Sequence, residues 1–269
     1  MGPIFANVRS ATALAILLLT ASTGVRAEDL PIVGTGDGIE MLQAVADSYN
    51  AEHGQARVSV PPSIGSGGAV ASVGGERQKL GRVARPLTET EKAQGLVEVP
   101  LIRIPSAIFV HRGVGVATLT SAQVAAVFSG GIDNWSALGG PDLKIRVVRR
   151  EETDSTLSVL RATMPGWRDL VLTSRSKTAT TTQDAIATVR DTPGAIGFGP
   201  FSPGLASDFT VLSIDGRAPR DPGYPSAVTL ALIYKTATKD AEASAFLTFA
   251  TSDRAGQLMA ERGGAPLKP

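Results

Sequence analysis

The 269-residue sequence contains no cysteine, two histidines and only 5% aromatic residues. The absence of cysteine excludes a disulfide scaffold, a Cys-ligated zinc or iron–sulfur site and a thiol nucleophile. The two histidines, His53 and His111, leave little room for a histidine-rich metal site. A net charge of +1 with scattered basic residues argues against a nucleic-acid-binding surface. We therefore expect a globular protein without cofactor or metal, whose chemistry depends on backbone groups, hydroxyls, arginines and carboxylates.

The first 27 residues differ from the rest of the chain. Arg9 precedes a short apolar run at 11–20, and the small residues Val25 and Ala27 stand where a processing enzyme would read positions −3 and −1. This pattern predicts a secretory signal peptide that is cleaved after Ala27. The run is about ten residues long, too short for the roughly 30 Å of a bilayer core. We expect a periplasmic, nearly neutral mature chain, which must hold any anion by local features.

Short apolar runs alternate with helical segments along the remaining sequence. We predict strands at 32–33, 57–60, 102–110, 144–148, 195–198, 209–214 and 228–234, and helices at 41–53, 121–127, 155–162, 182–190, 240–250 and 252–262. The helix at 121–127 is preceded by Thr120 and has Gln123 as its third residue, a capping box. Strand–helix alternation of this kind predicts an α/β architecture with mostly parallel sheets.

Three predicted strands end in a glycine-rich or polar turn that opens a helix. The turns lie at 34–38, 65–68 and 149–156. A helix N-terminus presents unpaired N–H groups and about half a positive charge, and glycine lets the backbone approach a ligand closely. Turns from two facing lobes could therefore enclose a small tetrahedral oxyanion. The alternative is that each is an ordinary strand-to-helix turn with a capping Ser, Thr or Asp.

Several segments, in order, resemble the periplasmic phosphate-binding proteins of bacterial phosphate ABC transporters, a family of type II solute-binding proteins. The most specific segment, at 119–140, reads LTSAQVAAVFSGGIDNWSALGG. The others lie at 63–68, 84–87, 193–197, 223–225 and 256–267. The resemblance covers nearly all of the chain after Ala27 and identifies it as a divergent member.

The resemblance implies a two-lobed, venus-flytrap α/β fold with a mostly parallel sheet in each lobe and two hinge crossings. Lobe one would combine 28–104 with 226–269, lobe two would be 105–225, and the hinges would lie near 104–107 and 224–228. The implied function is capture of inorganic phosphate between the lobes for delivery to an ABC permease in the membrane. It implies no enzymatic activity, no nucleic-acid partner and a monomer.

Matched position by position, the family's anion-binding residues are Thr35, Gly36, Asp37, Gly38, Ser66, Gly67, Gly68, Arg150, Asp154, Ser155 and Thr156. Arg150 falls on the family's phosphate-pairing arginine and could make a charge-assisted, bidentate contact to an oxyanion. The alternative is a solvated arginine beside Arg149. The resemblance implies neither catalytic nor metal-ligating residues.

The sequence departs from the family at the residues that distinguish phosphate from other anions. The family's proton-accepting aspartate is matched by Lys79, and its serine–arginine pair by Ala84 and Arg85. Asp37 and Asp154 instead bring carboxylates into two of the turns. Each either accepts a proton from the ligand or caps its helix. A third interpretation is that the ligand is another oxyanion or that anion binding is weakened.

Other functions remain open. The chain could bind another oxyanion or a phosphorylated solute, it could be a secreted phosphate-ester hydrolase, or it could serve as a sensor. Against a hydrolase, we find no cluster of histidines or acids that would hold a metal. Ser174 and Lys177 match a Ser-x-x-Lys motif of serine enzymes, but its partner motifs are missing and we predict a loop there.

Overall fold

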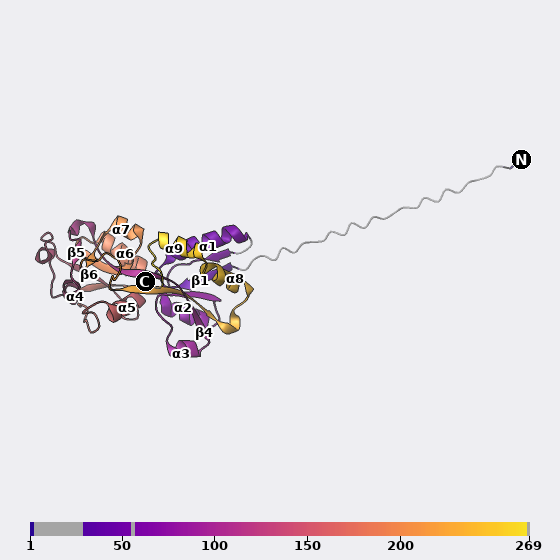
Figure 1. Cartoon of the computed structure of the whole chain (residues 1–269), viewed down its shortest axis with the longest axis horizontal. Helices are drawn as coiled ribbons and strands as arrows, with labels where there is room; N and C mark the ends of the chain where they lie inside the picture. Colours follow the sequence, from indigo (N-terminus) through magenta and orange to yellow (C-terminus); the bar gives the residue numbers. More distant parts are fainter. Residues whose placement is uncertain (3–28, 55–56, 268–269) are drawn as a thin grey trace.

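The computed structural model describes residues 1–2, 29–54 and 57–267 (Figure 1). The predicted signal peptide at 1–27 and its cleavage after Ala27 therefore fall outside the described residues, except for the first two. Across the described ranges, no helix combines the length and the apolar character needed to cross a bilayer.

Helices cover both faces of a long sheet. The strands are β1 (Asp29–Gly34), β2 (Arg57–Ser59), β3 (Leu80–Val83), β4 (Leu96–Val110), β5 (Thr118–Leu119), β6 (Arg146–Arg150), β7 (Ser176–Ala179), β8 (Ala195–Pro200), β9 (Thr210–Val211), β10 (Ser213–Ile214) and β11 (Ala227–Lys235). The α-helices are α1 (Ile39–His53), α2 (Gly65–Gly74), α3 (Glu89–Ala93), α4 (Ser121–Ser129), α5 (Ser155–Thr163), α6 (Thr182–Asp191), α7 (Pro203–Asp208), α8 (Ala241–Ala250) and α9 (Asp253–Glu261).

The strand order is β2-β1-β3-β11-β4-β8-β6-β7, with β9 also beside β4. β4 joins the two halves of the sheet, because its residues up to Pro105 pair with β11 and those from Ser106 onward pair with β8. Pro105 stands where the partner changes, a position at which a missing N–H is tolerated. The predicted two-lobed α/β fold is confirmed. The sheet, however, is mixed rather than mostly parallel, because β4 and β11 run antiparallel to each other and to their outer neighbours.

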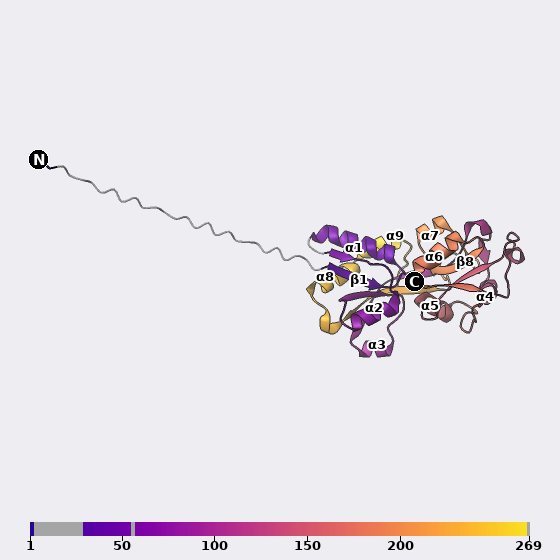
Figure 2. The ribbon, with the colours of Figure 1, turned by 180° about the vertical axis from the view of Figure 1, so that it is seen from behind.

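Each half of the sheet has its own hydrophobic core. In β11, Val228 and Leu230 face α1, α8 and α9, whereas Ala231 and Ile233 face α2, as the two-residue period of a strand requires. The other half buries Trp135 among residues of α4, α5 and β4. Both views accordingly show α1, α2, α3 and α8 in one lobe and α4 to α7 in the other (Figures 1 and 2).

Several local predictions need correction. The glycines at 65–68 do not form a turn before a helix; they are the first turn of α2, which begins directly after Ile64. The predicted strand at 209–214 is divided into β9 and β10, because Leu212 between them donates its N–H to Ile108 of β4. Lys177 lies in strand β7 rather than in a loop.

A buried arginine in β3 fixes the loops that lead into the cleft between the lobes. Arg82 is fully buried, and its guanidinium donates hydrogen bonds to the carbonyls of Thr35 (2.7 Å), Pro61 (2.8 Å) and Ile32. Burial lowers the pKa of Arg82 to about 10. These bonds satisfy one carbonyl within β1 and two in the segments that follow β1 and β2, so Arg82 positions the Thr35 turn from behind.

Candidate functional site

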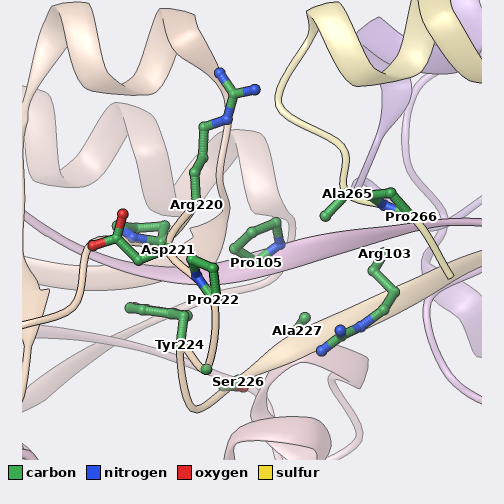
Figure 3. A pocket seen from close by; sticks show the side chains of 12 residues that line it. Arg103, Pro105, Arg220, Asp221, Pro222, Tyr224, Ser226, Ala227, Ala265 and Pro266 are labelled. Carbon is green, nitrogen blue, oxygen red and sulfur yellow. The ribbon is translucent and has the colours of Figure 1, made fainter. Parts of the chain in front are cut away.

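Among the cavities of the described residues, two of similar size lie where the lobes meet and are candidate binding sites. One, of about 380 Å³, is lined by residues at 103–105, 219–227 and 265–266. Proline rings and Tyr224 form its walls, and the side chains of Arg103 and Arg220 extend in different directions (Figure 3). Its cationic groups therefore do not converge on one point, as a site for a small anion requires.

The other cavity, of about 330 Å³, is the cleft between the lobes. The predicted residues that line it are Thr35, Gly36, Ser66, Gly67, Gly68, Arg150, Asp154 and Ser155. The N-terminal residues of α2 and the turns before α5 and α6 all reach this space. Three helix N-termini with one arginine make it the better anion site, because their N–H groups and dipoles point at a common volume.

The structure separates three of the predicted site residues from the cleft walls. Asp37, Gly38 and Thr156 are absent from the lining. A Cβ on Gly38 would stand 2.6 Å from Leu230, so this glycine is needed for close packing on β11 at φ 72°. Asp37 and Thr156 lie behind the wall, bonded to each other.

Sequence reasoning missed the turn before α6. Thr180 and Thr181 line the cleft, and the Thr181 Oγ1 accepts a hydrogen bond of 3.0 Å from the Asp184 N–H at the start of the helix. The sequence signal was present, since Thr-x-x-Asp before a helical segment is a helix-start pattern. It was not used because the preceding strand, β7, is short and polar.

Arg150 is 8% exposed and already has partners, so it is not a solvated arginine. Its Nη2 lies 2.7 Å from Asp154 Oδ2 and donates to the Thr180 carbonyl at 3.3 Å. Its Nη1 donates to Thr182 Oγ1 at 3.1 Å. The buried Nε has no hydrogen-bond partner among the described residues. Arg150 thus brings a positive charge to the cleft wall, and its Nε donor is unused among the described residues.

Asp154 does cap its helix, as one of the two interpretations expected. Its Oδ1 accepts the Leu157 N–H at 3.0 Å at the start of α5. Burial raises the pKa of the Asp154 carboxyl to about 6, with a further rise from the negative charge of Asp37 and a smaller opposite effect from Arg150. Asp154 therefore titrates near neutral pH on the wall of the cleft, so the capping role does not prevent it from exchanging protons.

Asp37 does not cap its helix. The N-cap of α1 is Gly38, and no side chain caps the helix. The Asp37 carboxylate instead accepts hydrogen bonds from Thr156 (2.8 Å) and Thr182 (3.0 Å), which belong to α5 and α6 of the other lobe. Burial raises the pKa of Asp37, while these hydrogen bonds and Arg150 act in the opposite direction.

Two further hydrogen bonds cross the cleft. Ser155 Oγ donates to Ser66 Oγ at 2.8 Å, and Ser66 Oγ in turn accepts the N–H of Ala84 at 3.1 Å. Gln183 Nε2 lies 3.4 Å from the Gly36 carbonyl. Together with the Asp37 contacts, these hydrogen bonds join the turn before α1 and the first turn of α2 to the first turns of α5 and α6.

The other departures from the family pattern lie outside the cleft lining. Lys79 forms an ion pair of 2.8 Å with Asp240. Arg85 makes a two-pronged contact with Glu91, at 2.9 and 2.7 Å. The Arg85 guanidinium lowers the pKa of Glu91 to about 2. The charges of both basic residues are thus directed to acids of their own lobe. Within the described ranges, no group of three or more His, Cys, Asp or Glu side chains is arranged to hold a metal ion.

Comparison with known proteins places the fold in a family. Residues 20–254 match the model of the PBP superfamily domain. A phosphate-binding protein PstS from Bacillus subtilis is 31% identical over 196 residues, covering 71% of this chain. The chain spans 63% of the length of that relative.

Solved structures show the same architecture. A phosphate ABC transporter substrate-binding protein from Clostridium perfringens, solved with bound phosphate, has a TM-score of 0.82 at 23% identity and covers 90% of this chain and 100% of its own. An ABC-type phosphate transport receptor from Vibrio cholerae has a TM-score of 0.66 at 22% identity, with 89% and 100% covered. The fold and the family match agree, and the chain belongs to the PBP superfamily.

Proposed function

We propose that this chain binds inorganic phosphate in the cleft between its lobes and delivers it, in the periplasm, to an ABC permease. The observation that carries the proposal is the convergence of three helix N-termini and Arg150 on one cleft. The similar proteins from B. subtilis, C. perfringens and V. cholerae are all described as phosphate-binding or phosphate-transport proteins, which supports the same ligand.

The proposed lobes are 28–104 with 226–269, and 105–225. Support comes from β4, whose pairing partner changes from β11 to β8 between Pro105 and Ser106. The second crossing, near 224–228, leads into β11 alongside it. Two adjacent crossings allow the lobes to rotate about one axis, and closure on a ligand is the expected motion.

Binding in this cleft needs no covalent step, so we propose that the chain is not an enzyme. The donors are backbone N–H groups at the start of α2, the Ser66 and Ser155 hydroxyls, and the Arg150 guanidinium. Each replaces a water around the anion, and donors fixed by the fold need no reorganisation when the ligand arrives.

Isothermal titration of the purified chain tests this function. Phosphate should give a saturable binding signal and sulfate a weaker one. Arg150→Gln should abolish the phosphate signal, and Arg168→Gln, a change at an exposed arginine of the same lobe, should leave it intact. Absence of phosphate binding to the wild-type chain from pH 5 to 8 would refute the proposal.

The size of the cleft favours a phosphorylated solute as the second candidate ligand. Its volume of about 330 Å³ equals that of roughly eleven water molecules at about 30 Å³ each. That is more than a single tetrahedral ion fills. A competition panel of sugar phosphates and other oxyanions against phosphate separates the candidates. Turnover of a generic phosphate ester by the wild-type chain, lost in Arg150→Gln, would instead favour the hydrolase.

A further inference from the structure

We propose that Asp37 is an internal ligand between the lobes, directly behind the wall of the cleft. Its carboxylate, carried by the first lobe, occupies hydroxyl donors at the N-termini of two helices of the second lobe. It holds the lobes together without a solute, and an entering oxyanion must displace it. Displacement of Asp37 by an oxyanion rests on the proposed function, whereas closure of the ligand-free protein does not.

The surroundings of the Asp37 carboxylate are those of a bound anion. Thr156 is the second residue of α5 and Thr182 the first residue of α6, so both hydroxyls stand at positive helix ends. They donate to the two carboxylate oxygens at 2.8 and 3.0 Å. Arg150 donates to Thr182 from the other side, which places a guanidinium one hydroxyl away from the carboxylate.

A role within its own lobe does not account for this arrangement. Asp37 does not cap α1, because Gly38 holds that position and no side chain bonds to the helix N-terminus. The backbone N–H of Asp37 donates to Thr35 Oγ1 at 3.2 Å, within the same turn. Both side-chain hydrogen bonds therefore leave the lobe that carries the residue.

Because Asp37 is buried, its hydrogen bonds with Thr156 and Thr182 contribute to the free energy that keeps the lobes closed. Asp37 is 2% exposed, and an ionised carboxylate is strongly disfavoured in such a place unless donors surround it. If the lobes opened, the carboxylate would regain water and the two threonine hydroxyls would be free. Thr156 and Thr182 do not line the closed cleft, so an oxyanion reaches these hydroxyls and helix ends only after the carboxylate has left them.

The competition has a predictable size. A ligand that binds only molecules with free donors has its apparent Kd raised by the reciprocal of their fraction. If Asp37 occupies the donors in about nine of ten molecules, its removal lowers the apparent Kd for phosphate about tenfold. An interpretation in which Asp37 accepts a proton from bound phosphate predicts the reverse, a loss of affinity in the same variants.

The first measurement is phosphate affinity by isothermal titration in Asp37→Ala and in Asp37→Asn, which preserves the shape of the side chain. Asp47→Asn is the matched control, since Asp47 lies on the exposed side of α1, the helix that follows Asp37, and accepts a hydrogen bond from Gln43. We expect about tenfold tighter binding in both Asp37 variants and no change in the control. Unchanged or weaker binding in both Asp37 variants would overturn the proposal.

The second measurement is the separation of the lobes without phosphate. Because the chain has no cysteine, Ala93→Cys in α3 and Ala162→Cys in α5 allow one spin label on each lobe. We expect the ligand-free wild type to show a single short distance and the Asp37 variants to shift towards longer ones. Equal distributions in wild type and variants would contradict the internal-ligand role. If wild type binds no phosphate, the proposed function fails, and this measurement still decides the role of Asp37.

Discussion

Phosphate affinity should fall as pH rises above about 6, because Asp154 lies on the cleft wall as a carboxyl with a raised pKa. Burial and the negative charge of Asp37 favour the neutral form of the Asp154 carboxyl. Arg150 and the Leu157 and Thr156 N–H groups favour its ionised form. An anion bound beside it raises its pKa further. The complex thus holds a proton that the free protein loses, and binding takes up that proton.

The size of the effect follows from the position of the pKa. Below about pH 6 Asp154 is protonated in both states, and it can donate a hydrogen bond to the ligand. Above that value each pH unit weakens binding up to tenfold, about 1.4 kcal/mol, until the complex also loses its proton. Between pH 6 and pH 8 the loss therefore reaches about 100-fold at most.

Comparison of the wild type with Asp154→Asn isolates the part of the pH dependence that comes from Asp154, because the ionisation of phosphate itself affects both proteins equally. Asparagine is as good an N-cap as aspartate, so α5 should keep its start. Titrations from pH 5 to 8 should give similar Kd values at the acid end and a progressively tighter variant towards pH 8. Asp169→Asn, an exposed change, should follow the wild type. A constant ratio of wild-type to Asp154→Asn Kd over the whole range would refute the reasoning.

Three other substitutions test single contacts. Arg150→Lys should weaken phosphate binding at least tenfold in titration, because a lysine cannot reproduce the fork of donors. Gly36→Ala should prevent full closure, measured by small-angle scattering with phosphate, because its Cβ would lie 2.8 Å from Thr182; Gly256→Ala, with no atom within 4 Å, is the neutral control. Arg82→Met should lower the free energy of unfolding in urea by about 3 kcal/mol, since it removes the donor of three carbonyls, two of them in buried contacts. An unfolding midpoint equal to that of wild type would show that water replaces the guanidinium.

Local signals in the sequence predicted most elements of the fold. The Thr120 capping box forms as expected, with the Gln123 N–H donating to Thr120 Oγ1 at 3.1 Å. The helices at α1 and α6 also begin and end close to their predicted bounds, because their apolar stripes and end signals lie within a few residues of each other. Short elements such as β3 and α7 were missed, since four to six residues carry too little periodicity.

The pairings that make the site are of a different kind. Asp37 is separated from Thr156 by 119 residues and from Thr182 by 145, so no local pattern links them. Mixed strand direction was missed for a similar reason. Whether β11 lies parallel or antiparallel to β4 depends on the path of the chain between them. The residue pattern within each strand is the same for either direction.

The first turn shows where a position-by-position transfer from a family stops being safe. Residues 35–38 have the place and the glycine content of an anion-binding turn, and they do reach the cleft at Thr35 and Gly36. At Asp37, however, the turn supplies an acceptor instead of a donor, and the donors come from the opposite lobe. The negative charge of Asp37 therefore makes this turn accept hydrogen bonds rather than donate them to an anion, although the backbone of residues 35 and 36 reaches the cleft. Since Arg150 must then serve two aspartates, an oxyanion can bind tightly only if a carboxylate leaves the donors or takes up a proton.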